Sequence, residues 1–139
     1  MRVKVPRLVV AGLSGDSGKT LVSLGIARAL TDRGVKVRPF KKGPDYIDTA
    51  WLGVAARSTC RNLDTFLMPD EAMAGSLATA ARDADLILVE GNRGLFDGVD
   101  IEGSHSTAML ARRLAAPVVL VLDCTKMTRT AAALVLGCQ

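Results

Sequence analysis

The chain has 139 residues, 49% hydrophobic and 4% aromatic, and its 18 Lys and Arg against 14 Asp and Glu give a net charge of +4. A chain of this length buries roughly two thirds of its unfolded surface, so we expect one domain over residues 1–139, and disorder is excluded. The longest apolar run, residues 115–122, is too short to span a membrane, and no cleavage pattern follows the basic start, so a cytoplasmic protein without a membrane partner is expected. The charge is too small and scattered for nucleic acid but suits phosphate or polycarboxylate ligands.

Strand-length apolar runs alternate with segments of helical periodicity, a pattern that predicts an α/β fold: a mostly parallel sheet with helices on both faces. Residues 46–68 form a long segment, and its aromatic residues Trp51 and Phe66 are predicted to pack beneath it, with a stacking platform for a ligand as the alternative. At 139 residues the domain is short for this architecture, so it is expected to be truncated. In chain order the elements are a strand at 8–11, a helix at 19–33, a strand at 35–40, a helix at 70–82, a strand at 86–90, a helix at 106–114, a strand at 117–123 and a helix at 128–136.

Polar or glycine-rich loops follow three of these strands, at residues 12–20, 41–48 and 90–97. In open parallel sheets ligands bind beyond the carboxyl ends of the strands. We therefore expect the three loops to converge on one site.

The first of these loops has the sequence and the strand-to-helix context of a phosphate-binding loop, which predicts a P-loop NTPase-like fold. Its backbone N–H groups and the helix N-terminus attract phosphate oxygens, Lys19 can reach the β and γ phosphates, and Thr20 can bind magnesium. The first glycine is Gly12, whereas a strict G-x-x-x-x-G-K-[ST] pattern would place it at Leu13. The predicted nucleotide-binding residues are Gly15, Asp16, Ser17, Gly18, Lys19 and Thr20.

The two later loops carry carboxylates that suit magnesium beside a phosphate group. Asp45 and Asp48 lie three residues apart next to Lys41, although a solvated charged turn would look the same. Glu90 closes an apolar strand and is a candidate metal or water-positioning ligand, with capping of the next loop as the alternative. The turn at residues 94–98 is either a mobile cover for the substrate or a closely packed turn.

Other conspicuous residues favour ordinary roles. His105 has no Ser or Cys partner at a recognisable spacing, so a helix-start or surface role is expected. Arg57 and Arg61 either bind an anionic substrate or lie on the surface. The three cysteines lack C-x-x-C spacing and are expected to pack as small hydrophobic residues, without a disulfide or zinc.

Several of these segments resemble the N-terminal, ATP-binding part of the cobyrinic acid a,c-diamide synthase family, which is related to dethiobiotin synthetase. The most specific is residues 43–48, Gly-Pro-Asp-Tyr-Ile-Asp. The family's phosphate loop also carries its first glycine one place early, as here. The other matching segments are residues 12–20, 40–42, 61–64, 67–68, 90–91, 94–98 and 116–121.

The resemblance implies an enzyme that uses ATP and Mg²⁺ to phosphorylate acetate carboxylates of a corrinoid or related tetrapyrrole, after which ammonia from glutamine displaces phosphate. Thr49, Cys60, Asn92 and Arg93 depart from the usual family residues. The substrate therefore stays open among cobyrinic acid, hydrogenobyrinic acid and nickel sirohydrochlorin. The implied roles are catalytic for Lys19, Lys41, Asp48 and Asp97, and magnesium binding for Thr20, Asp45 and Glu90.

The family's adenine-binding segments and its glutaminase domain lie outside these 139 residues, so a glutaminase is expected downstream or in trans. With so few strands, an exposed sheet edge is predicted, which favours a homo-oligomer.

Three alternative functions are considered. A partitioning-type ATPase switch carries a signature lysine where Ser14 stands, and a GTP-binding protein needs an Asn-Lys-x-Asp run that the chain lacks. A dethiobiotin synthetase-like ligase is the third, and the sequence at residues 43–48 favours the corrinoid branch over it.

Overall fold

The computed structural model describes residues 4–139, so the first three residues of the predicted domain lie outside the described part. Five strands alternate with five helices along the chain. They are β1 (Arg7–Gly12), α1 (Lys19–Asp32), β2 (Val37–Lys42), α2 (Ile47–Ala56), β3 (Arg61–Leu63), α3 (Asp70–Ala81), β4 (Leu86–Gly94), α4 (Thr107–Leu114), β5 (Val118–Val121) and α5 (Ala131–Leu136).

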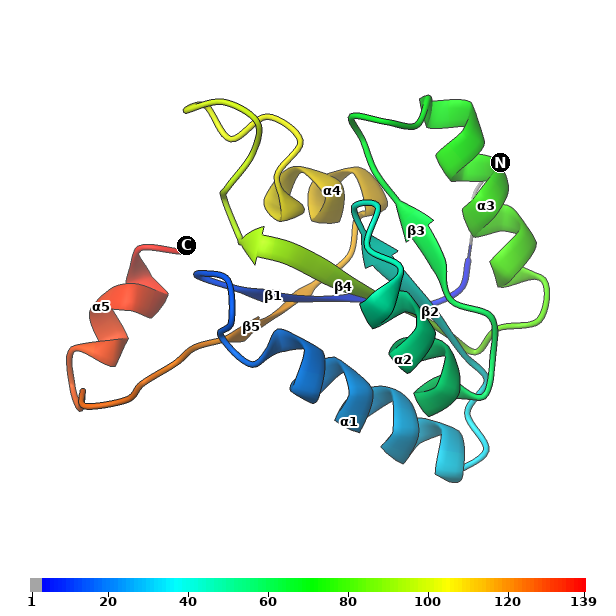
Figure 1. The fold of residues 1–139 in the computed structure, drawn as a ribbon, viewed down its shortest axis with the longest axis horizontal. Helices are drawn as coiled ribbons and strands as arrows, with labels where there is room; N and C mark the ends of the chain where they lie inside the picture. Colours follow the sequence, from blue (N-terminus) through cyan, green and yellow to red (C-terminus); the bar gives the residue numbers. More distant parts are fainter. Residues whose placement is uncertain (1–3) are drawn as a thin grey trace.

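The five strands form one parallel sheet in the order β3-β2-β4-β1-β5. Figure 1 shows α1 and α2 on one face of this sheet and α3 and α4 on the other. The predicted α/β class, a parallel sheet with helices on both faces, is confirmed.

Each face of the sheet has its own apolar core, because successive strand residues point to opposite faces. On β1, Val9 packs into the cluster beneath α3 and α4, whereas Val10 packs into the cluster beneath α1 and α2. On β4, Val89 and Leu88 divide in the same way. Burial of both faces explains the continuous apolar runs at residues 8–11 of β1 and 86–89 of β4.

The segment between β2 and α3 differs from the prediction, because it contains the helix α2 and the short strand β3. On α2 the buried positions are Leu52 and Ala56, four residues apart, so that Trp51 points outward and is 60% exposed. Phe66 is 65% exposed. The prediction that Trp51 and Phe66 pack inside was therefore wrong.

The C-terminal part of the described chain is the least covered. The edge strand β5 pairs only with β1, and its Val118 and Val119 are each 37% exposed, which confirms the predicted open edge. Figure 1 shows α5 standing away from the sheet, and none of its residues is buried. Cys124, in the loop between them, is exposed, so its predicted packing role was wrong.

Among residues 4–139, no helix has the length and apolar character needed to cross a membrane.

Candidate functional site

The three predicted loops do converge, at the carboxyl ends of β1, β2 and β4. They surround a cavity of about 440 Å³, called here the phosphate cavity. All six predicted nucleotide-binding residues lie on its wall, with three further predicted catalytic or metal-binding residues, Lys41, Asp45 and Asp48; Glu90 is fully buried and not part of the wall. Its lining is Gly15, Asp16, Ser17, Gly18, Lys19, Thr20, Lys41, Asp45, Asp48, Asn92 and Arg93.

The geometry of the phosphate loop explains the early glycine. A Cβ atom at Gly12 would lie 2.1 Å from Ser17 Oγ and 3.1 Å from Lys19 Cγ, so a side chain there would displace the Ser17 hydroxyl and crowd the stem of Lys19. Gly18 caps α1 with a φ of 87°, in the left-handed region that glycine adopts without strain. Leu13, where the strict pattern would have the glycine, is only half-buried and carries its side chain there.

Lys19 is nearly buried at the start of α1, with 7% of its surface exposed. Its Nζ donates to the carbonyl oxygen of Ser14 at 2.6 Å and to Ser17 Oγ at 3.3 Å. Burial, and after it the charge of Lys41, lowers the pKa of Lys19. Within residues 4–139 this ammonium makes no ion pair with a carboxylate, so it is a cation suited to an incoming phosphate.

Lys41 is held between two carboxylates at the end of β2. Lys41 and Glu90 are paired in the register of β2 and β4, which places their side chains next to each other. Lys41 Nζ lies 2.7 Å from Glu90 Oε1 and 2.6 Å from Asp48 Oδ2, and only 3% of Lys41 is exposed. Burial alone would lower the pKa of Lys41, but the hydrogen bonds to Asp48 and Glu90 outweigh it and raise the pKa.

The hydroxyl of Thr20 completes this group. Thr20 Oγ1 donates to Glu90 Oε1 at 2.7 Å and lies 3.5 Å from Asp48 Oδ2. The second carboxylate oxygen of Glu90, Oε2, is buried and has no hydrogen-bond partner among the described residues. Hydroxyl and carboxylate oxygens are the ligands that Mg²⁺ prefers, so the donor set fits that ion.

The described residues hold no group of three Asp, Glu, His or Cys side chains arranged as a metal site. Mg²⁺ usually binds through one or two protein oxygens and keeps waters and substrate phosphates as its other ligands. Such an ion therefore fits this cavity only together with a nucleotide.

Asp45 lies on the cavity wall, but its carboxylate bonds to the first residues of α2. Asp45 Oδ1 accepts hydrogen bonds from the backbone N–H groups of Ile47 and Asp48, at 2.9 and 3.0 Å, and so helps begin α2. Asn62 on β3 donates to the carbonyl oxygens of Gly43 and Asp45 at 2.7 and 2.9 Å. Our sequence reasoning assigned no role to Asn62, which fixes the acidic loop against the sheet.

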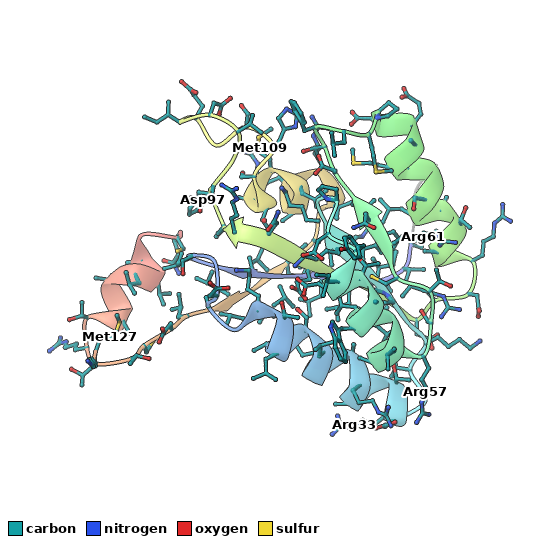
Figure 2. The ribbon with its side chains drawn as sticks, in the orientation of Figure 1. Arg33, Arg57, Arg61, Asp97, Met109 and Met127 are labelled. Atoms are coloured by element: carbon teal, nitrogen blue, oxygen red, sulfur yellow. The ribbon has the colours of Figure 1, made fainter. Side chains whose placement is uncertain are left out.

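Asp97 is not in the phosphate cavity. Figure 2 shows it at the carboxyl end of β4, where Asp97 Oδ2 accepts the N–H of Gly94 at 3.0 Å. It lines a neighbouring cavity of about 500 Å³, called here the side cavity. Asn92 and Arg93 line both cavities, and sequence reasoning noted these two residues only as departures from a family pattern.

Two other sets of predicted residues are separate from the phosphate cavity. Arg57 lies near Arg33 at the far end of α1 (Figure 2), and its Nη2 is 3.4 Å from Asp32 Oδ1. Arg61 lines a different cavity together with Arg57. His105 lies two residues before α4, and its Nδ1 is 2.9 Å from Thr65 Oγ1, which agrees with a helix-start role.

A parallel sheet with a glycine-rich loop between β1 and α1 and an acidic residue at the end of a central strand defines the class of P-loop nucleotide-binding α/β domains. Residues 8–139 match the family model CbiA, described as the CobQ/CobB/MinD/ParA nucleotide binding domain. The chain belongs to this family.

Curated relatives show which members of the family the chain is similar to in sequence. The chain is 49% identical over 137 residues to a cobyrinate a,c-diamide synthase of Magnetococcus marinus, and 48% identical over 134 residues to a hydrogenobyrinate a,c-diamide synthase of Streptomyces coelicolor. These matches cover 99% and 96% of this chain but only 29% and 28% of the relatives. The chain thus spans less than a third of their length. Among solved structures, the hydrogenase maturation factor HypB of Archaeoglobus fulgidus has a TM-score of 0.45 at 15% identity, covering 97% of this chain and 90% of that one.

Proposed function

We propose that this domain binds ATP with Mg²⁺ and transfers its γ-phosphoryl group to an acetate carboxylate of a corrinoid or related tetrapyrrole. The acyl phosphate then reacts with ammonia, released from glutamine by a glutaminase domain, to give an amide. The observation that carries the proposal is the phosphate loop beside a group of linked polar side chains: Thr20, Lys41 and Asp48 line the phosphate cavity, and the fully buried Glu90 lies behind them, bonded to Thr20 and Lys41. The names of the relatives supply the substrate class.

ATP solves a chemical problem in this reaction. A carboxylate is a poor electrophile because its leaving group would be oxide. Attack of the carboxylate oxygen on the γ phosphorus forms a new P–O bond, breaks the bond to ADP, and leaves an acyl phosphate. Ammonia then attacks the acyl carbon, loses a proton, and expels inorganic phosphate.

The residues of the chain have distinct parts in this scheme. Lys19, whose ammonium makes no ion pair with the residues that the structure describes, stabilises the charge on the transferred phosphoryl group. Thr20 and Glu90 would hold Mg²⁺, with Asp45 facing the same cavity, and the ion would neutralise charge on the β and γ phosphates. Lys41 keeps Glu90 and Asp48 in place and offsets one of their two negative charges, which leaves a net negative charge that suits a magnesium ion.

The test is a comparison of substrates with the protein expressed from its complete reading frame. Cobyrinic acid and hydrogenobyrinic acid are each expected to stimulate ADP formation, and hydroxylamine should trap the acyl phosphate as a hydroxamate. Stimulation by diaminopelargonic acid instead would indicate a dethiobiotin synthetase-like ligase. Nucleotide-dependent dimerisation with no stimulation by any carboxylate would indicate an ATPase switch.

A further inference from the structure

Two consecutive lysines at the end of β2 point to opposite faces of the sheet and have opposite surroundings. Lys41 is neutralised by two carboxylates, as described above. Lys42 is only 8% exposed, yet among residues 4–139 its Nζ has no hydrogen bond and no ion pair. Burial lowers the pKa of Lys42, and the charge of Asp64 only partly offsets this. Lys42 Nζ is not one of the fully buried unpaired polar atoms of the described residues, so this ammonium reaches the cavity that Lys42 lines, and an anion supplied by a ligand can pair with it there.

Lys42 lines the side cavity, which adjoins the phosphate cavity at Asn92 and Arg93. Arg93 is exposed, has a left-handed φ of 50°, and makes no ion pair within the described chain. One ligand can therefore lie across both cavities, with Arg93 at the boundary.

The two carboxylates in the side cavity are already used by the backbone. Asp64 Oδ1 accepts the N–H groups of Phe66 and Leu67 at 2.7 and 3.0 Å, and Asp97 Oδ2 accepts the N–H of Gly94. Asp64 and Asp97 keep their negative charge but are held by these backbone N–H groups, whereas Lys42 and Arg93 make no ion pair with any described residue.

Exposed apolar side chains border the same cavity. Phe66, Leu67 and Val99 line it and are 65%, 60% and 61% exposed. The ring of His105 meets Phe66 edge-on, with centroids 5.5 Å apart, and so supports it. Two unpaired cations beside an apolar border suit a carboxylate carried on a large apolar ring.

We propose that Lys42, assisted by Arg93, binds a carboxylate of the substrate other than the one that is phosphorylated. The substrate is then a polycarboxylate whose apolar body lies against the border of the side cavity. This inference rests on the proposed function, because it places the reacting carboxylate beside Lys19. Lys42 is a residue that determines substrate specificity, with no part in nucleotide binding.

Equilibrium binding to the protein expressed from its complete reading frame tests this inference. The variants are Lys42→Met, which removes the charge and keeps the apolar stem, Lys42→Arg, which restores the charge, and Arg93→Met. The matched control is Lys36→Met, which removes an exposed lysine just before β2, at the opposite end of the strand. The probes are MgATP, cobyrinic acid and the small polycarboxylate tricarballylate.

Lys42→Met should raise the Kd for cobyrinic acid at least tenfold, as expected for loss of a charged hydrogen bond, and should change the Kd for MgATP less than twofold. Lys42→Arg should recover most of the affinity for cobyrinic acid. Arg93→Met should weaken the binding of cobyrinic acid about threefold or more, and Lys36→Met should leave the affinity for both ligands unchanged. Unchanged cobyrinic acid affinity in Lys42→Met overturns the inference, as does an equal loss of MgATP. If Lys42→Met does not fold, unchanged affinity in Arg93→Met overturns it.

The two proposals fail in different ways. If the wild-type protein binds MgATP and tricarballylate but no tetrapyrrole, the proposed function fails, and weaker tricarballylate binding in Lys42→Met still supports the carboxylate site. If no polycarboxylate depends on Lys42, the inference fails whatever the substrate is.

Discussion

Replacing Lys41 with Met should destabilise the domain by about 3–5 kcal/mol, because it removes one partner of a buried ionic group. The lysine is 3% exposed, and its loss leaves the fully buried Glu90 with Thr20 as its one remaining hydrogen-bond donor. For a domain of this size the melting temperature should fall by about 10 °C or more. Chemical denaturation of the wild type and the variant at pH 7 measures the difference in the free energy of unfolding.

The pH dependence of that difference gives a second test of the same interaction. Because the pKa of Lys41 is raised above 10.5 in the folded state, its stabilising contribution is complete below pH 10.5 and is lost as the pH rises through the folded-state pKa. The difference in the free energy of unfolding between the wild type and Lys41→Met should therefore be constant between pH 7 and 10 and decrease above that range. Because the other lysines titrate in both proteins, their contribution cancels in this difference.

Two controls make the result specific to the ionic group. Lys36→Met removes an exposed lysine whose pair with Asp83 is 3.2 Å long, and should cost less than about 1 kcal/mol. Adding Glu90→Gln to Lys41→Met removes the uncompensated charge and should restore about 1–3 kcal/mol. A loss below about 1 kcal/mol in Lys41→Met, or strictly additive effects in the double variant, would refute the reasoning.

Three further predictions concern the phosphate loop and the cysteines. Lys19→Ala should abolish MgATP binding in a fluorescence titration, and retention of wild-type affinity would contradict the role of Lys19 in binding phosphate. The melting temperature should not fall, because the substitution removes a nearly buried cation that pairs with no carboxylate among residues 4–139. Gly12→Ala should weaken MgATP binding, because its Cβ would displace the Ser17 hydroxyl and crowd the stem of Lys19; an unchanged Kd would contradict this. Gly75→Ala, on the exposed side of α3 where a Cβ meets open space, should bind MgATP normally and raise the free energy of unfolding by about 0.5–1 kcal/mol. At pH 8 iodoacetamide should modify the exposed Cys124 well before Cys60, because burial raises the pKa of the Cys60 thiol to about 12. Mass spectrometry measures the labelling, and equal rates at the two cysteines would disprove this.

The parts of the fold that were predictable from sequence are those where both faces of a strand are buried. Strands β1 and β4 are apolar at successive positions because each residue meets a core, and that pattern is visible in one dimension. The helix α2 and strand β3 were missed for a physical reason. Trp51 and Val54 are exposed apolar residues that obscure the helical period of α2, and three residues are too few to show the alternation of a strand.

The phosphate cavity was largely predictable because parallel strands bring their following loops together. The register that pairs Lys41 with Glu90 depends on strand order, which composition and periodicity do not encode. The contribution of Asn62, and the separation of Asp97 into the side cavity, depend on hydrogen bonds to backbone atoms. Such contacts leave no spacing pattern in the sequence.

Isotope transfer tests the central claim, activation of a carboxylate by phosphorylation, most directly. Cobyrinic acid labelled with ¹⁸O in its carboxylates would be incubated with ATP, Mg²⁺, ammonium chloride and the protein expressed from its complete reading frame, so that added ammonia replaces the glutaminase. An acyl phosphate intermediate transfers one carboxylate oxygen to phosphate for every amide formed, so one ¹⁸O atom is expected in each phosphate released by amidation. Amide formation accompanied by unlabelled phosphate, or ATP hydrolysis without any label transfer, would contradict the account.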